Sequence, residues 1–197
     1  MIPKRFPRKQ IPGILQQHQV WITSQLEKLQ GSLQQPVLPS SISIALSAEQ
    51  FSISTTPCTR ASLQQQRGSL IIQYQHEQQA IDLLRHWVRQ QAIQLLSPRL
   101  KALAQELGFD YRRVSVRSQK SRWGSCSSTG TISLNDQLIF MPPATVRYLM
   151  IHELCHTRHM NHSPAFWQLV KSCCPNYRSE ETVLSKGRDY VPEWFLK

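Results

Sequence analysis

Two histidines of the chain lie four positions apart in the segment His152-Glu153-Leu154-Cys155-His156. On an α-helix, four positions correspond to about 40° of rotation and about 6 Å of rise, so both imidazole rings would project from one side. Two ring nitrogens can then bind one zinc ion at about 2.0–2.1 Å. Glu153 would lie beside the ion, where its carboxylate can accept a proton from metal-bound water. The spacing therefore predicts a hydrolytic site with one Zn2+ per chain and Glu153 as its general base.

Such a site needs a third protein ligand, and we favour His162. Asn161 can adopt the left-handed conformation that ends a helix. The residue before Pro164 is disfavoured in the α conformation. The chain can therefore turn back after the motif and bring His162 to the metal, with the same ligand spacing as in metzincins.

Three other residues compete for the third position. Glu180 and Glu181 lie on a later predicted helix, which is where some zinc enzymes carry a glutamate ligand. His159 would share a side with His152 if the helix continued, but about 10 Å further along its axis, a long reach for a shared ion. Contacts with an oxyanion or with the substrate also have three candidates: Arg122, His159 and Asn161.

Five basic residues without an intervening acid precede the motif: Arg112, Arg113, Arg117, Lys120 and Arg122. The whole chain carries a formal net charge of +11, so nucleotide or nucleic acid is a conceivable partner. A solvated strand face is the commoner reason for such a run. On an alternating strand, Arg113 and Arg117 share one face and Arg112 lies on the other. This division weakens a phosphate clamp and favours a peptide or protein substrate.

The 197 residues are enough to bury a core without disulfide bonds or a structural metal. The five cysteines are odd in number and show no Cys-x-x-Cys spacing, which favours reduced thiols and a cytoplasmic location. The first thirty residues lack the apolar segment of a signal peptide. No apolar run approaches the length of a membrane span, so we expect no membrane partner.

Hydrophobic periodicity predicts three regions: a basic, Gln-rich extension (1–40), a small antiparallel strand region with a helix (41–96), and a catalytic domain (97–197). Alternation predicts strands near 42–44, 51–53 and 70–72. One helix is expected over 78–96. Ser97 would cap a second helix that starts at Pro98, and Gly108 would end it.

The predicted catalytic domain continues with strands near 114–116 and 132–134. A helix from Pro143 to about His159 is apolar around most of its circumference, which is typical of a buried helix. Further helices are expected from Pro164 and near a cap at Ser179. Trp167 is interpreted as core or as a pocket wall.

Four blocks of the sequence, in this order, resemble the YgjP-like metallopeptidase family, a zincin-type group related to SprT-like and WLM metalloproteases. The blocks are Ser-Arg-Trp-Gly-Ser-Cys at 121–126, Thr-Ile-Ser-Leu-Asn at 131–135, the motif at 152–156, and Met-Asn-His-Ser-Pro-Ala-Phe-Trp at 160–167. The resemblance covers residues 97 to about 178. It implies an α+β, zincin-like metallopeptidase domain, here with a small N-terminal strand-and-helix lobe, and it implies that His162 completes the metal site.

The expected function is therefore that of a zinc metallopeptidase. The resemblance also leaves a metal-dependent nucleoside triphosphate (UTP) pyrophosphatase open, because that activity is described within the family. A nucleic-acid-associated protein with a structural metal is a third hypothesis, but a structural site has four protein ligands whereas a catalytic site leaves one position to water. We expect the strand at 131–134 to be an edge along which an extended peptide lies.

Overall fold

The computed structural model describes residues 11–24 and 37–196. Contacts divide the chain into two compact units, one ending at Val37 and one beginning at Leu38. The first unit contains helix α1 (Ile11–Gln17), which has no buried residue. Much of the predicted Gln-rich extension, at 1–10 and 25–36, lies outside the described residues. The second unit contains the motif.

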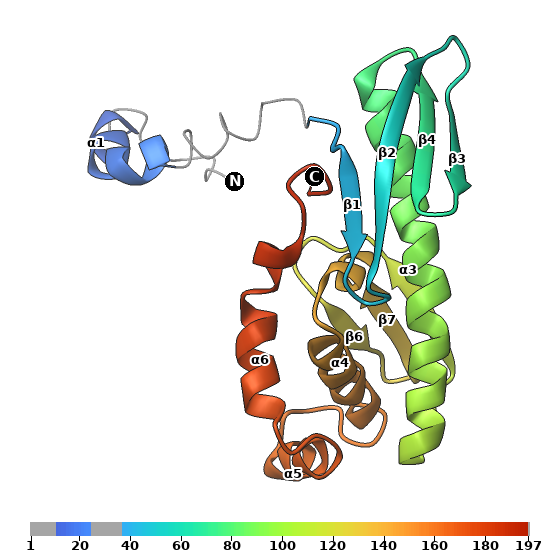
Figure 1. Ribbon diagram of the computed structural model, residues 1–197. Helices are drawn as coiled ribbons and strands as arrows, with labels where there is room; N and C mark the ends of the chain where they lie inside the picture. The colour runs from blue at the N-terminus through green and yellow to red at the C-terminus, as the bar shows by residue number, and fades with distance from the viewer. Residues whose placement is uncertain (1–10, 25–36, 197) are drawn as a thin grey trace. The chain divides into compact units, whose positions relative to one another are not determined.

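The second unit opens with a four-stranded sheet in the order β1-β2-β4-β3 (Figure 1). Its strands are β1 (Ser41–Ile44), β2 (Glu49–Pro57), β3 (Ser62–Gln66) and β4 (Ser69–Tyr74). The β2–β4 pair is parallel, and the other two pairs are antiparallel. Alternate residues of β1 and β4, such as Ile44 and Ile72, are buried in the core. The three predicted strands are thus confirmed, but the sheet is mixed because β2 pairs with β4 in parallel.

Helix α3 (Glu77–Leu107) spans the length of this unit (Figure 1). Two helices separated at Ser97 were expected, and this prediction is wrong: α3 continues through Pro98. An internal proline costs about 3 kcal/mol. Leu96 and Leu100, on either side of it, are both fully buried, and burial of each contributes about 1.5–3 kcal/mol. The continuous apolar stripe therefore outweighs the proline, and the helix ends as predicted, at a left-handed Gly108.

A second sheet holds β5 (Arg113–Arg117), β6 (Gly124–Cys126) and β7 (Thr131–Asn135) in the order β5-β7-β6. The β5–β7 pair is parallel and the β6–β7 pair is antiparallel. The expectation that 131–134 forms an edge is wrong, because β7 is paired on both sides. The edges are β5 and the short strand β6, which was not predicted since three residues show no alternation.

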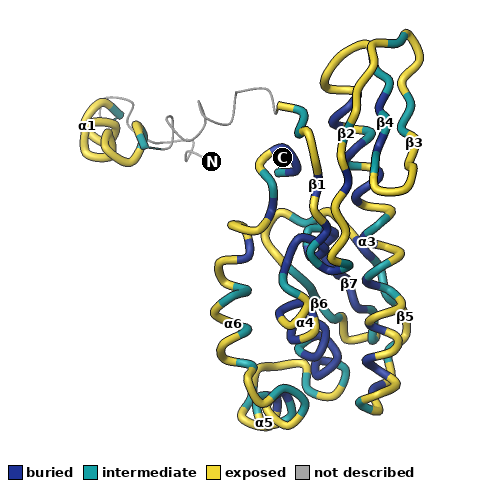
Figure 2. Tube along the Cα trace, viewed as in Figure 1, coloured by how far each residue is buried: buried dark blue, intermediate teal, exposed yellow. Residues whose placement is uncertain are grey.

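The 3-10 helix η2 (Asp136–Phe140) leads into α4 (Pro143–Cys155), which is buried on most sides (Figure 2). This helix ends earlier than the predicted His159. Helix α5 (Pro164–Cys173) is capped by Ser163, whose hydroxyl accepts a hydrogen bond from the Phe166 amide. Helix α6 (Tyr177–Ser185) and η3 (Gly187–Tyr190) follow. The predicted cap at Ser179 is wrong, since α6 starts two residues earlier.

The architecture confirms the α+β class. Both sheets and α4 contribute to one hydrophobic core together with α3. None of the described helices is long and apolar enough to cross a membrane.

Candidate metal site

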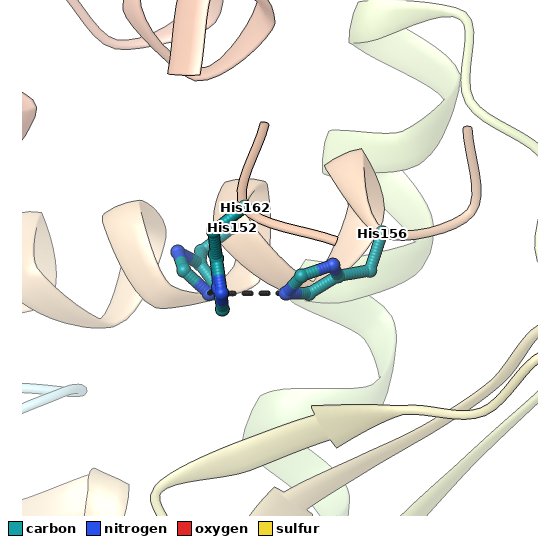
Figure 3. A group of neighbouring side chains, drawn as sticks. All are labelled: His152, His156 and His162. Carbon is teal, nitrogen blue, oxygen red and sulfur yellow. Dashed lines mark hydrogen bonds between the residues drawn. The ribbon is translucent and has the colours of Figure 1, made fainter. Parts of the chain in front are cut away.

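Three imidazole rings converge at the C-terminal end of α4 (Figure 3). His152 lies in the last turn of the helix, His156 follows its end, and His162 lies in the loop before α5. The Nε2 of His152 lies 3.2 Å from the Nε2 of His156 and 3.1 Å from that of His162. Nitrogens that share one tetrahedral zinc are about 3.3 Å apart. The three rings are therefore spaced to bind one ion.

The turn after α4 reverses the chain and brings His162 back to His152 and His156. The amides of Arg158 and His159 both donate to the Cys155 carbonyl, which closes the last turn of the helix. The His159 carbonyl then lies 3.0 Å from Nδ1 of His156. Because a carbonyl only accepts, Nδ1 carries the proton and the lone pair of Nε2 is free for a metal.

Aromatic side chains surround the cluster. The ring of Phe166 is fully buried, and its centroid lies 5.0, 4.5 and 4.8 Å from those of His152, His156 and His162. Trp167 stacks on His162 at 5.6 Å. Burial, with smaller contributions from the two neighbouring histidines, lowers the pKa of His152 to about 4. The ring is therefore neutral at ordinary pH, which is the form that binds metal.

Glu153 follows His152 on α4 and is 4 % exposed. Burial raises the pKa of this carboxyl to about 8, although the charge of Arg122 opposes the shift. Its Oε2 is buried and has no hydrogen-bond partner among the residues described. The carboxyl also presses against β6: a Cβ added to Gly124 would lie 2.7 Å from Oε1. Only glycine admits this close approach.

Asn135, at the end of β7, fixes the loop that carries Arg122. The side chain is 2 % exposed. Its Nδ2 donates to the carbonyls of Gln119 at 2.9 Å and Arg122 at 2.8 Å, and its Oδ1 accepts from the Gln137 amide. The backbone amide of Asn135 donates to the Trp123 carbonyl. One buried asparagine thus joins two of the sequence blocks. A polar residue that ends an apolar strand was the available signal for it.

A protein-family model matches most of the chain. The family model described as "YgjP-like, metallopeptidase domain" matches residues 1–187. The chain belongs to the YgjP-like family. The family is one of metallopeptidases, so membership supports a metal-dependent peptidase.

Two solved structures are similar over part of this YgjP-like chain. One is the metallopeptidase zymogen of Pyrococcus abyssi abylysin, at 25% identity and a TM-score of 0.40, covering 46% of this chain and 90% of that one. The other is the metallopeptidase zymogen of Methanocaldococcus jannaschii jannalysin, at 18% identity and a TM-score of 0.41, covering 49% and 97%. A search of curated proteins found no match.

The side chains of the other predicted metal ligands of this YgjP-like chain lie outside the three-histidine cluster. His159 contributes its carbonyl to His156, and its side chain does not join the three converging nitrogens. Asn161 is exposed. The carboxylate of Glu180 accepts a hydrogen bond of 2.7 Å from Thr145, and neither Glu180 nor Glu181 belongs to the cluster. Only His162 of the candidate third ligands is brought to the other two histidines.

Proposed function

We propose that the chain is a zinc metallopeptidase in which His152, His156 and His162 hold one zinc ion and Glu153 is the general base. The observation that carries the proposal is the convergence of three imidazole nitrogens, together with the buried Glu153 that follows His152, whose Oε2 has no hydrogen-bond partner among the described residues. A set of three histidines leaves one position of a tetrahedral ion open, which is typical of catalytic and not of structural zinc. Nitrogen ligands also favour zinc over calcium or magnesium, which prefer oxygen.

When bound, the ion supplies Lewis acidity, which polarises a peptide carbonyl and acidifies water. The residues of the chain do the rest. Glu153 takes a proton from the attacking water and later transfers it to the leaving amine. A base of this kind works best when its pKa lies near the operating pH, and burial moves this carboxyl in that direction. Phe166 packs against all three imidazole rings, while His162 stays exposed to solvent.

The edge strand β6 supports a peptide or protein substrate. It contacts α4 and places Gly124 against Glu153. An unpaired strand edge offers main-chain donors and acceptors to an extended peptide. A peptide added there would run past the general base. In this proposal β6 has the substrate-binding role that was expected for the strand at 131–134.

The basic run gives less support to a triphosphate substrate. Its five members, at 112, 113, 117, 120 and 122, are all exposed. Arg122 is the member whose charge acts on the pKa of Glu153. A single cation beside the base can assist a developing oxyanion, whereas a triphosphate needs several convergent ones.

All five cysteines are free thiols, which supports the proposed cytoplasmic location.

The deciding experiment is Glu153→Gln in the zinc-loaded protein, assayed on a mixed peptide library. We expect the zinc content to stay at one per chain and turnover to fall by about 10²–10⁴-fold. The matched control is Glu106→Gln, which changes an exposed glutamate paired with Arg147 and should leave turnover unchanged. Near wild-type cleavage by Glu153→Gln would refute the proposal. So would Glu153-dependent pyrophosphate release from UTP without any peptide cleavage.

A further inference from the structure

A cavity of about 450 Å³ lies away from the histidine cluster. Its walls come from α3, the loop after β5, η2, η3 and the segment near the C-terminus. Neither the three histidines nor Glu153 lines it. The volume is within the range of about 300–1,000 Å³ that is usual for small-molecule sites.

Four cationic side chains line this cavity: Arg85, Arg89, Lys120 and Arg188. One exposed acid, Asp82, faces them, and its carboxylate lies 3.7 Å from Arg85. Within the described part of the chain, no carboxylate forms an ion pair with Arg89, Lys120 or Arg188. The cavity therefore has an uncompensated positive charge that favours an anion.

Two of the arginines hold the walls together. Nη2 of Arg85 donates to the carbonyls of Trp194 at 2.9 Å and Leu196 at 3.2 Å, which ties the C-terminal segment to α3. Nη2 of Arg188 donates to the Lys120 carbonyl at 2.6 Å, which ties η3 to the loop after β5. The elements that carry the cations are thus linked to one another by hydrogen bonds. Less ordering of these elements is therefore needed when a ligand binds.

The same cavity has an apolar wall. Phe195 and Leu196 line it, and a ring of the ligand can pack against them.

We infer that this cavity binds a small phosphorylated molecule of nucleotide size, with its phosphates on Arg89, Lys120 and Arg188 and its apolar part on Phe195. A nucleic-acid strand fits less well, because its repeating phosphates need an extended basic track and not one concave cavity.

The test is calorimetric titration of the full chain with ADP, once with zinc bound and once after the metal has been removed. We expect saturable 1:1 binding in both states, because the cavity does not include the histidines. Binding should weaken about tenfold or more in Arg89→Ala and in Lys120→Ala, through loss of a charge-assisted hydrogen bond. Adenosine, which lacks phosphate, should bind much more weakly.

The matched control is Arg113→Ala, which removes the same charge from an exposed position of β5 outside the cavity. It should leave ADP binding unchanged. Equal weakening by Arg113→Ala and Arg89→Ala would show non-specific attraction and overturn the inference. Absence of saturable binding, or binding only with zinc present, would do the same. Tighter binding of a single-stranded oligonucleotide, with equal sensitivity to both variants, would assign the charge to nucleic acid.

Discussion

Gly124 and Glu153 are in contact without room for another atom: a Cβ on the glycine would lie 2.7 Å from Oε1 and 3.0 Å from Cδ of the carboxylate. The glycine belongs to the edge strand β6, and the glutamate to α4. Their approach sets how close a strand edge comes to the carboxylate that we assign as the base. Any side chain at position 124 must move the strand or the carboxyl.

Gly124→Ala should therefore reduce peptide cleavage by about tenfold or more while zinc remains bound. The alanine side chain would displace Glu153 or the edge of β6, and not the three histidines. A small displacement of a catalytic group lowers the reaction rate strongly. kcat/KM and zinc content, measured together, check this. Gly13→Ala is the control, because a Cβ there meets nothing within 4 Å. Undiminished cleavage by Gly124→Ala would show that the approach has no catalytic role.

The third metal ligand can be identified by metal content. His162→Ala should lower zinc affinity by more than about 100-fold, beyond the 10–100-fold typical of changes outside the ligand set. Glu180→Ala and Glu181→Ala should retain zinc, since neither side chain joins the cluster. His159→Ala should retain it as well, because its carbonyl and not its ring contacts His156. Zinc loss in a glutamate variant, with retention in His162→Ala, would reverse the assignment.

Phe166 should tune the metal site although it has no ligand atom. Its ring contacts all three imidazoles, so Phe166→Leu should loosen their orientation and weaken zinc binding about tenfold. Val170→Ala, at another fully buried position of α5, should reduce stability but keep the affinity. Competition with a chromophoric chelator and denaturation by urea separate the two effects. Equal affinities in both variants would leave Phe166 with a packing role alone.

The buried carboxyl predicts a pH-dependent stability of the metal-free protein. The pKa of Glu153 is raised to about 8, from an ordinary 4.5, so between these values the folded state holds a proton that the unfolded state has lost. Stability should therefore fall as pH rises through this window. Glu153→Gln cannot ionise, so it should become more stable than wild type by up to a few kcal/mol toward pH 8.

Urea denaturation from pH 5 to pH 8 in the presence of a chelator measures this difference. His152, with its pKa lowered to about 4, destabilises both proteins as pH falls below 6.5, so it cancels in the comparison. Added zinc should shrink the difference, because a nearby cation favours the ionised carboxylate. Parallel pH profiles without metal would contradict the prediction.

The histidine pair could be predicted from sequence because helical spacing is a local property. The return of His162 was predicted, but not its cause: α4 ends at Cys155, before Asn161, and Asn161 does not adopt the left-handed conformation. The contact of Gly124 with Glu153 could not, because it joins residues from a strand too short to show alternation and from a helix after it. The central position of β7 in its sheet was missed for the same reason: pairing partners depend on tertiary structure.

At Pro98 the local sequence signal was clear, but it predicted the wrong structure. A proline after a capping serine is a strong local signal for a new helix. Burial of Leu96 and Leu100 overrides it, and only the packed structure reveals that their stripe is continuous.

The unbroken α3 has a practical consequence for dissecting the chain. The helix packs against β3 and β4 in its first half and against β5 and η2 further on. A recombinant fragment that began at residue 97 would cut the helix in its middle and expose apolar surface of both sheets' shared core. Such a fragment should aggregate, whereas one that begins at Leu38 keeps the helix whole.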